Sequence, residues 1–261
     1  MLLTGEFDIH IINACNLSCK HCSVLDYKYK DEEYGVINKF LTLNQVKEQV
    51  KLIKKWGYQL ETLKILGGEP TTHPEFPEIV DFLLTSEVAK QVWLNTNALN
   101  MTEKVISACS KLDKILISIY PMVDVSINQV AKWKESGLSK EFNKVHIAVM
   151  TSFERFGVPQ PNIEYTPEGN WKTCWQKEHC RTIEGETMYQ CAISFGRKVE
   201  GIHISDWGTK LNRPLKMCDT CYFPPLEEQW SSLKPKKDYR NLHKGIKLWN
   251  NYNNKIKLKE I

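Results

Sequence analysis

The sequence lacks the features that direct a protein into or across a membrane. No apolar run approaches the roughly 18 residues that a membrane-spanning helix needs, and the residues before Cys15 show no basic segment followed by an apolar one, as a secretory signal would. We therefore expect a cytoplasmic protein with no membrane partner. Thiols stay reduced in that compartment, so the nine cysteines are expected to bind metal rather than to form disulfides.

The sequence also lacks an excess of charge of one sign. Its 35 basic and 31 acidic residues leave a net charge of +4, and lysine and glutamate are interleaved along most of the chain. This pattern does not indicate a nucleic-acid partner, and we expect the more basic stretch 234–261 to be a solvated helical tail. The composition, 42% hydrophobic and 25% charged, is typical of a soluble protein with one large domain, or with one domain and an appendage.

Three cysteines, Cys15, Cys19 and Cys22, stand four and three positions apart in a loop that follows the apolar segment 7–12. One short loop can thus present three thiolates to a single metal centre. A four-iron cluster bound by three thiolates keeps one iron without a protein ligand, where chemistry can take place. A structural zinc site completed by His21 is the alternative that this spacing leaves open.

A Gly-Gly-Glu-Pro turn, residues 67–70, directly follows the apolar segment 63–66. Two glycines remove side chains where a backbone must approach a ligand closely. The carboxylate of Glu69 can hold an ammonium group. A plain turn between a strand and a helix is the alternative interpretation of the same residues.

The C-x-x-x-C-x-φ-C loop, followed about forty-five residues later by G-G-E-P, resembles the signature of the radical S-adenosylmethionine (SAM) superfamily. His21 stands in the φ position, which is more often aromatic in the family. The resemblance implies a [4Fe-4S] cluster on Cys15, Cys19 and Cys22. Its open iron would bind the amino and carboxylate groups of S-adenosyl-L-methionine, and one electron would cleave that cofactor to a 5′-deoxyadenosyl radical.

The resemblance also implies which residues contact the cofactor. The turn after the second strand would contact the amino group of S-adenosyl-L-methionine. Asn97 stands in a Thr-Asn-Ala segment where the family usually has Thr-Asn-Gly, and Ser118 stands where members often contact the ribose or the carboxylate. An ordinary strand serine is the alternative for Ser118. The implied cofactor-binding set is His21, Gly67, Gly68, Glu69, Asn97 and Ser118.

Segments with strand and helix periodicity alternate through the first part of the chain. We expect strands at 7–12, 63–66, 92–97, 114–120 and 145–150, and helices after Thr42, from Pro77, after Thr102 and near Ser126. Cys109 is expected in the core. Such alternation predicts an α/β fold, a partial (β/α) TIM-like barrel of parallel strands over residues 1–157, with the motifs at the carboxyl ends of the strands.

A second set of cysteines lies in residues 158–261, which we expect to form a cysteine-rich domain. Cys218 and Cys221 form a C-x-x-C knuckle, and a hairpin turning at Glu184-Gly185 is expected between Cys180 and Cys191. Four thiolates saturate either zinc or a four-iron cluster. The pattern resembles the auxiliary-cluster modules of the SPASM and twitch subfamilies, and the absence of later cysteines favours the twitch type, with one auxiliary [4Fe-4S] cluster.

The choice among the five late cysteines stays open at this point. The expected ligands are Cys180, Cys191, Cys218 and Cys221. Cys174 can replace Cys180, or can be a thiol near the substrate or an inert loop residue. For His179, beside Cys180, a solvent-facing or supporting role is expected rather than ligation.

The resemblance implies that the first chemical step abstracts a hydrogen atom from the substrate. An auxiliary cluster with four thiolate ligands cannot bind substrate unless it loses one of those ligands. It can, however, take up the second electron of an oxidation. We therefore expect a net oxidation, such as the dehydrogenation of a sugar or an amino acid derivative. Tyr120, Glu154 and Arg155 are candidates for acid–base work at strand ends, but the sequence assigns no catalytic side chain.

Two other functions stay open. One is a peptide- or protein-modifying maturase that forms a cross-link or an oxidised residue, although only fourteen residues precede Cys15, where such members often carry a leader-binding domain. The other is a non-catalytic binding protein scaffolded by two zinc sites, which would not need the cofactor-binding turn. For the enzyme we expect a small-molecule or peptide substrate and an electron donor such as flavodoxin or ferredoxin.

Overall fold

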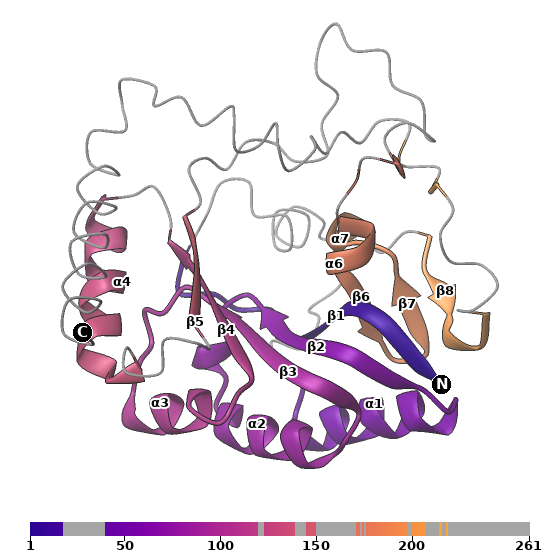
Figure 1. Ribbon diagram of the computed structural model, residues 1–261, viewed down its shortest axis with the longest axis horizontal. Coiled ribbons are helices and arrows are strands. Elements are labelled where there is room, and N and C mark those ends of the chain that lie inside the picture. The colour runs from indigo at the N-terminus through magenta and orange to yellow at the C-terminus, as the bar shows by residue number, and fades with distance from the viewer. Residues whose placement is uncertain are drawn as a thin grey trace, which may run out of the picture.

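A single mixed sheet organises the computed structural model of the chain, which describes residues 1–17, 40–119, 123–138, 145–149, 171–172, 174, 176–197, 200–206, 214–215 and 218 (Figure 1). Its eight strands lie in the order β5-β4-β3-β2-β1-β6-β7-β8. They are β1 (Leu2–Ile12), β2 (Gln59–Gly67), β3 (Ala89–Thr96), β4 (Lys114–Ile119), β5 (Val145–Val149), β6 (Arg181–Glu184), β7 (Thr187–Tyr189) and β8 (Ile202–His203).

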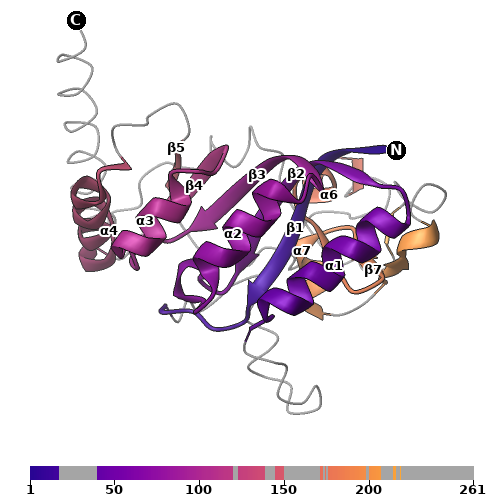
Figure 2. The ribbon, with the colours of Figure 1, turned by 90° about the horizontal axis from the view of Figure 1, so that it is seen from below.

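Strands β1 to β5 are parallel and alternate with helices, as the sequence predicts. The helices are α1 (Leu43–Lys55), α2 (Phe76–Thr85), α3 (Glu103–Cys109) and α4 (Val123–Ser136), with a 3-10 turn at Pro70–Thr72. Figure 2 shows α1, α2 and α3 side by side across one face of the sheet. This arrangement confirms the parallel β/α architecture of a partial TIM-like barrel.

The helices begin where their capping residues are. Thr42 accepts a hydrogen bond from the backbone N–H of Gln45 at 3.3 Å, and the Gln45 side chain accepts one from the backbone N–H of Thr42 at 2.8 Å. This reciprocal pair satisfies two donors that a helix start leaves without partners. Thr102 caps α3 by accepting from the backbone N–H of Val105 at 3.4 Å. Cys109, at the end of α3, is fully buried, which confirms that it is a core residue.

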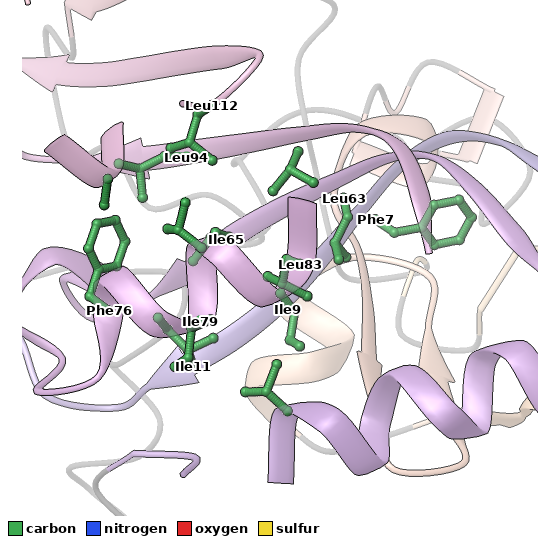
Figure 3. Packing of buried hydrophobic residues seen from close by; sticks show 14 of the residues in the cluster. Phe7, Ile9, Ile11, Leu63, Ile65, Phe76, Ile79, Leu83, Leu94 and Leu112 are labelled. Atoms are coloured by element: carbon green, nitrogen blue, oxygen red, sulfur yellow. The ribbon is translucent and has the colours of Figure 1, made fainter. Parts of the chain in front are cut away.

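The core lies between the sheet and the helices. Figure 3 shows Phe7, Ile9 and Ile11 of β1 in one core with labelled residues of β2, β3 and α2, among them Leu63, Ile65, Leu94, Ile79 and Leu83. Each such side chain contributes about 1.5–3 kcal/mol when buried. Because side chains alternate along a strand, the residues between them face the opposite, inner side of the sheet. That inner side carries Glu6, Asp8 and His10.

The second part of the sheet is a hairpin that extends β1. β6 pairs in parallel with β1, and β7 pairs antiparallel with β6 through Thr182 and Tyr189. The turn falls at Gly185, where φ is +60°, so the predicted hairpin is confirmed. Two short helices flank it, α6 (Gln176–His179) before β6 and α7 (Ala192–Arg197) after β7, and a 3-10 turn, Ile204–Asp206, follows β8. The hairpin therefore lies beside the strand that leads into the first cysteine loop.

A glutamine of α1 fixes the hairpin to the rest of the fold. The backbone N–H of Gly185 donates to Gln49 Oε1 at 2.5 Å, and Gln49 Nε2 donates to Gly185 O at 2.8 Å. Gln49 is buried while Gly185 is exposed, so the two bonds link the hairpin turn to the edge of the core. None of the helices in the described part of the chain combines the length and apolarity that crossing a bilayer requires. The division into domains at residues 157 and 158 stays a prediction.

Candidate functional site

The glycine turn lies directly against the start of the first cysteine loop. The backbone N–H of Gly68 donates to Ile12 O at 2.7 Å, and that of Glu69 donates to Ala14 O at 2.9 Å. A Cβ atom at Gly68 would stand 2.0 Å from Ala14 O, and one at Gly67 would stand 2.2 Å from Ile12 O. The glycines are therefore required by the approach of one backbone to another, before any ligand is considered.

Glu69 joins the ends of β2 and β3. Its carboxylate is 1% exposed and accepts four hydrogen bonds: from Thr71 N at 3.2 Å, Thr71 Oγ1 at 2.7 Å, Thr96 Oγ1 at 2.6 Å and Asn97 N at 2.7 Å. Burial raises the pKa of Glu69 and these donors oppose the rise, the Asn97 N–H foremost. A carboxylate surrounded in this way orders the backbone around it. Its contact with a cofactor amino group stays a prediction.

Asn97 connects the end of β3 to the cysteine loop. Its Nδ2 donates to Asn16 Oδ1 at 2.7 Å and lies 3.9 Å from Cys15 Sγ, while its Oδ1 accepts from Leu99 N at 3.0 Å. The next residue, Ala98, has a φ of +54°. That left-handed conformation favours glycine. It accounts for the Thr-Asn-Gly segment that is usual in the family, where this chain has Thr-Asn-Ala.

Gln129 of α4 binds backbone groups at the same carboxyl edge of the sheet, and the sequence analysis did not predict this role. Its Nε2 donates to Ser118 O at 2.8 Å and also to Asn97 O. Gln129 is 1% exposed. A glutamine within an amphipathic helix gives no signal of such a role. The Ser118 side chain is partly exposed, and its predicted cofactor contact stays a prediction.

His73 ties the chain that follows the cysteine loop to the glycine turn. Its Nε2 lies 2.8 Å from Leu41 O and its Nδ1 accepts from the backbone N–H of Glu75 at 3.0 Å, which assigns the proton to Nε2. Phe40 packs edge-on against the imidazole ring, with centroids 5.1 Å apart. Burial lowers the pKa of His73, so the neutral ring is favoured.

A buried lysine lies on the inner side of the sheet and was also missed. Lys64 Nζ, on β2, lies 2.9 Å from Glu6 Oε2 and 3.2 Å from Asp8 Oδ1, and donates to His179 O. Burial raises the pKa of Asp8 to about 6, with Lys64 opposing the rise. No sequence motif predicts this cluster, because its members come from segments far apart in the chain. His179 is partly exposed, and its Nδ1 lies 3.0 Å from Glu6 Oε1.

Two of the late cysteines, Cys180 and Cys191, flank the hairpin. Extending the pairing of Thr182 with Tyr189 by two residues places Cys180 opposite Cys191. Burial raises the pKa of the Cys180 thiol, Lys64 opposes this, and Asp8 and Cys191 raise it further. Cys191 Sγ accepts from Ser194 N at 3.3 Å.

Cys174 lies just before α6. Burial raises the pKa of its thiol, and the nearby backbone N–H groups of Gln176 and Lys177 oppose the rise. Two backbone donors on one sulfur suit a thiolate. This environment resembles that of Cys191 more than that of Cys180.

Several predicted ligands lie outside the described residues. These are Cys19, His21, Cys22 and Cys221, together with the acid–base candidates Tyr120, Glu154 and Arg155. Within the described ranges, no three His, Cys, Asp or Glu side chains are arranged to hold one metal ion. The ligand sets therefore stay predictions.

Known proteins are similar to this chain in sequence and in fold. A sequence model of the Radical SAM superfamily matches residues 9–154. The GTP 3′,8-cyclase of Pasteurella multocida is 32% identical over 97 residues, 37% of this chain and 27% of the relative. The mycofactocin maturase MftC of Mycobacterium tuberculosis is 23% identical over 210 residues, 71% of this chain and 51% of the relative.

Among solved structures, BtrN in an open conformation matches with a TM-score of 0.54 and 15% identity, covering 87% of this chain and 97% of that one. At this identity the likeness shows the fold alone. The chain spans 27%, 56% and 66% of the length of three GTP 3′,8-cyclases that it resembles in sequence.

The family match covers more than half of the chain and includes Cys15, the glycine turn and Asn97. Membership implies a [4Fe-4S] cluster and S-adenosyl-L-methionine as cofactors. The hydrogen bonds of these residues bring the family's motifs together at the carboxyl edge of the parallel strands. The chain belongs to the radical SAM superfamily.

Proposed function

We propose that this protein is a radical SAM enzyme that oxidises a small molecule after a hydrogen atom has been abstracted from it. The observation that carries the proposal is the contact between the glycine turn and the cysteine loop, Gly68 N to Ile12 O and Glu69 N to Ala14 O. It lies where barrel enzymes of parallel strands carry their sites. When bound, the cluster and S-adenosyl-L-methionine supply a 5′-deoxyadenosyl radical.

The surroundings of Cys15 fit a cluster ligand. Its sulfur accepts from Leu17 N at 3.4 Å, and Asn97 Nδ2 lies 3.9 Å away. Hydrogen bonds to sulfur stabilise thiolate ligands and tune the potential of the cluster that they hold. We assign the cluster to Cys15, Cys19 and Cys22, the last two outside the described residues.

We assign two tasks to the proposed cofactor-binding residues: contact with the cofactor and positioning of the residues that make this contact. Because the Glu69 carboxylate already accepts four hydrogen bonds, we assign to it the positioning of the turn and of Asn97. The proposed set remains His21, Gly67, Gly68, Glu69, Asn97 and Ser118, with the first outside the described residues. Gln129 supports this set by holding the carbonyl groups of Asn97 and Ser118.

An auxiliary [4Fe-4S] cluster would accept the second electron of the oxidation. The hairpin that carries Cys180 and Cys191 pairs with β1, which leads into the Cys15 loop. Phe195, four residues beyond Cys191, stacks on His10 with centroids 4.3 Å apart and packs in a small apolar cluster with Cys15. Cys15 thus lies near the hairpin that carries Cys180 and Cys191, which supports electron transfer between substrate and auxiliary cluster.

Two ligand sets for the auxiliary cluster each have support. The hairpin register favours Cys180 with Cys191, and the backbone donors to sulfur favour Cys174 with Cys191. Cys218 and Cys221 complete either set. Serine variants of Cys174 and Cys180 separate them: the variant of a ligand lowers the iron content after anaerobic reconstitution, and the variant of a non-ligand leaves it at the wild-type value.

Peptide modification is the second candidate function. It is favoured by the relative MftC, which is named a maturase and matches 71% of this chain. The family match makes a zinc-scaffolded binding protein the weaker explanation. For either enzymatic function we propose a low-potential donor such as flavodoxin or ferredoxin.

The test of the proposed function is the release of 5′-deoxyadenosine. The anaerobically reconstituted protein is incubated with S-adenosyl-L-methionine and dithionite, and the nucleoside is quantified beside the Cys15→Ala variant. We expect release by the wild type and none by the variant. Equal traces from both proteins would overturn the proposal.

A further inference from the structure

The inner side of the sheet carries a row of residues aligned by strand register. Asp8 of β1 pairs with Thr182 of β6 on one side and with Lys64 of β2 on the other, and Lys64 pairs with Trp93 of β3. Paired residues of parallel strands point to the same side of a sheet. Since Phe7 and Ile9 face the helices (Figure 3), the row faces inward. Asn95, two residues beyond Trp93, faces the same way.

Three oxygen atoms on this inner side have no hydrogen-bond donor. They are Asp8 Oδ2, Thr182 Oγ1 and Asn95 Oδ1; each is shielded from solvent, and among the described residues none has a partner. Asp8 and Thr182 are fully buried. Leaving a buried acceptor without a donor costs folding free energy. Three such atoms on three strands, all on one side, therefore indicate donors that arrive with a ligand.

The positively charged side chain in this row, Lys64, already has acidic partners. Lys64 Nζ is shared by Glu6, Asp8 Oδ1 and the carbonyl of His179. A phosphate or carboxylate of a substrate would have to compete with two carboxylates for it. The row thus favours an uncharged group that donates hydrogen bonds.

The row lies between a cavity and the cofactor edge. Trp93 also lines a cavity of about 690 Å³, together with residues nearer the amino ends of the strands such as Thr4, Gly5 and Glu61. This volume falls within the range of small-molecule sites. In the other direction, Asn95 is followed two residues later by Asn97, which contacts the Cys15 loop. A molecule bound on the row would face that loop.

We propose that Asp8, Thr182 and Asn95 bind the hydroxyl groups of the substrate, and that this substrate is an uncharged polyhydroxylated compound of the sugar or cyclitol class. The inference rests on the proposed function and names its substrate class. Several hydroxyl groups on one small ring supply donors to three acceptors at once. A carbon that bears a hydroxyl group is also the one at which a dehydrogenation would start.

The first test measures the thermal midpoint, Tm, of the reconstituted, substrate-free enzyme. Thr182→Val removes a buried hydroxyl that has no partner, so we expect Tm to rise by about 2–4 °C. The matched control is Thr96→Val, whose hydroxyl donates to Glu69 at 2.6 Å and accepts from Ala98 N at 2.9 Å; its Tm should fall. A fall for Thr182→Val as large as that of the control would overturn the proposal.

The second test uses four probes: myo-inositol, glucose, glucosamine and a tripeptide. We expect myo-inositol or glucose to raise the Tm of the wild-type holoenzyme and to increase 5′-deoxyadenosine release, with both effects reduced at least tenfold in Thr182→Val and Asn95→Leu. The proposal is overturned if no probe acts, if only the tripeptide acts, or if only glucosamine acts, the last result indicating an ammonium site.

The two proposals fail in different ways. Absence of any 5′-deoxyadenosine, with or without probe, contradicts the radical SAM activity. The direction of the Tm change in Thr182→Val does not depend on that activity, so it tests the unpartnered Thr182 hydroxyl by itself.

Discussion

Gly68 shows how a single missing side chain decides whether the site can form. A Cβ atom there would stand 2.0 Å from Ala14 O and 2.9 Å from Cys15 N, both backbone atoms that cannot move aside. The contrast is Gly57, where a Cβ would meet nothing within 4 Å although φ is +72°. The same residue type is thus kept for packing at one position and for backbone conformation at the other.

Gly68→Ala should lower the free energy of unfolding by about 3 kcal/mol, because the turn must separate from the cysteine loop. The [4Fe-4S] cluster that we assign to Cys15, Cys19 and Cys22 should be lost in this variant, and iron analysis will detect the loss. Gly57→Ala, the control, should cost only about 1 kcal/mol from its left-handed backbone and keep its iron. Equal losses of iron in the two variants would contradict the assigned role of Gly68.

Glu69→Gln should destabilise the protein by about 3 kcal/mol, because an amide NH₂ group would face donors that now bind a buried carboxylate. The control Glu75→Gln changes a partly exposed carboxylate that accepts from Leu43 N at 3.0 Å, and should cost less than about 1 kcal/mol. Denaturant unfolding measures both. Similar values would mean that the donors around Glu69 are satisfied by other groups.

His73 should make stability depend on pH in a defined direction. Burial lowers the pKa of its imidazole from the ordinary 6.5, so the unfolded chain takes up the proton first as the pH falls. The stabilising contribution of His73 is therefore present above pH 6.5 and is lost below it. Between pH 8 and pH 5.5 the wild type should lose more stability than His73→Gln, as measured by denaturant unfolding; parallel curves would contradict this.

At the scale of elements, the β6–β7 hairpin depends on a contact between residues 136 positions apart, Gln49 and Gly185. A side-chain amide that donates to the C=O and accepts from the N–H of the same residue pairs with the backbone as a neighbouring strand would. Because Gln49 is buried, the two bonds hold the hairpin, and with it Cys180 and Cys191, in a fixed position against α1.

Gln49→Glu removes the donor to Gly185 O and should cost about 2 kcal/mol. Amide hydrogen exchange over residues 181–191 should accelerate, while exchange in β2 stays slow. The control is Glu48→Gln, which alters an exposed carboxylate 2.5 Å from Lys51 and should change stability by less than about 0.5 kcal/mol. Unchanged exchange in the hairpin of Gln49→Glu would show that strand pairing alone holds it.

Periodicity predicted the parallel strands and their helices because each has one apolar face. It placed the start of β1 too late, at residue 7 rather than at Leu2. The register between Leu3 and Glu6 is irregular, and Gly5 lies there with a φ of +94°. A bulge of this kind breaks the alternation on which strand prediction depends. The hairpin was predictable from the glycine turn between two short strand-like runs.

At the scale of the whole molecule, the spacing of residues along the chain predicted a metal-binding role for the cysteines and a cofactor-binding role for the glycine turn. Such predictions are possible because each motif lies within a short stretch of sequence. The residues that support them were not predictable. Gln129, Lys64 and Gln49 act through partners brought near by the sheet topology, and their local sequences resemble an ordinary helix or strand. Asp8 and Thr182 meet only because β6 returns to pair with β1.

The central claim, that one chain holds a radical cluster and an auxiliary cluster, is tested most directly by counting iron. Iron and sulfide are measured in anaerobically reconstituted wild-type protein and in a variant with Cys15, Cys19 and Cys22 all changed to alanine. We predict about eight irons in the wild type and about four in the variant, as two four-iron clusters require. Zinc without iron in the wild type, or no iron left in the variant, would contradict the account.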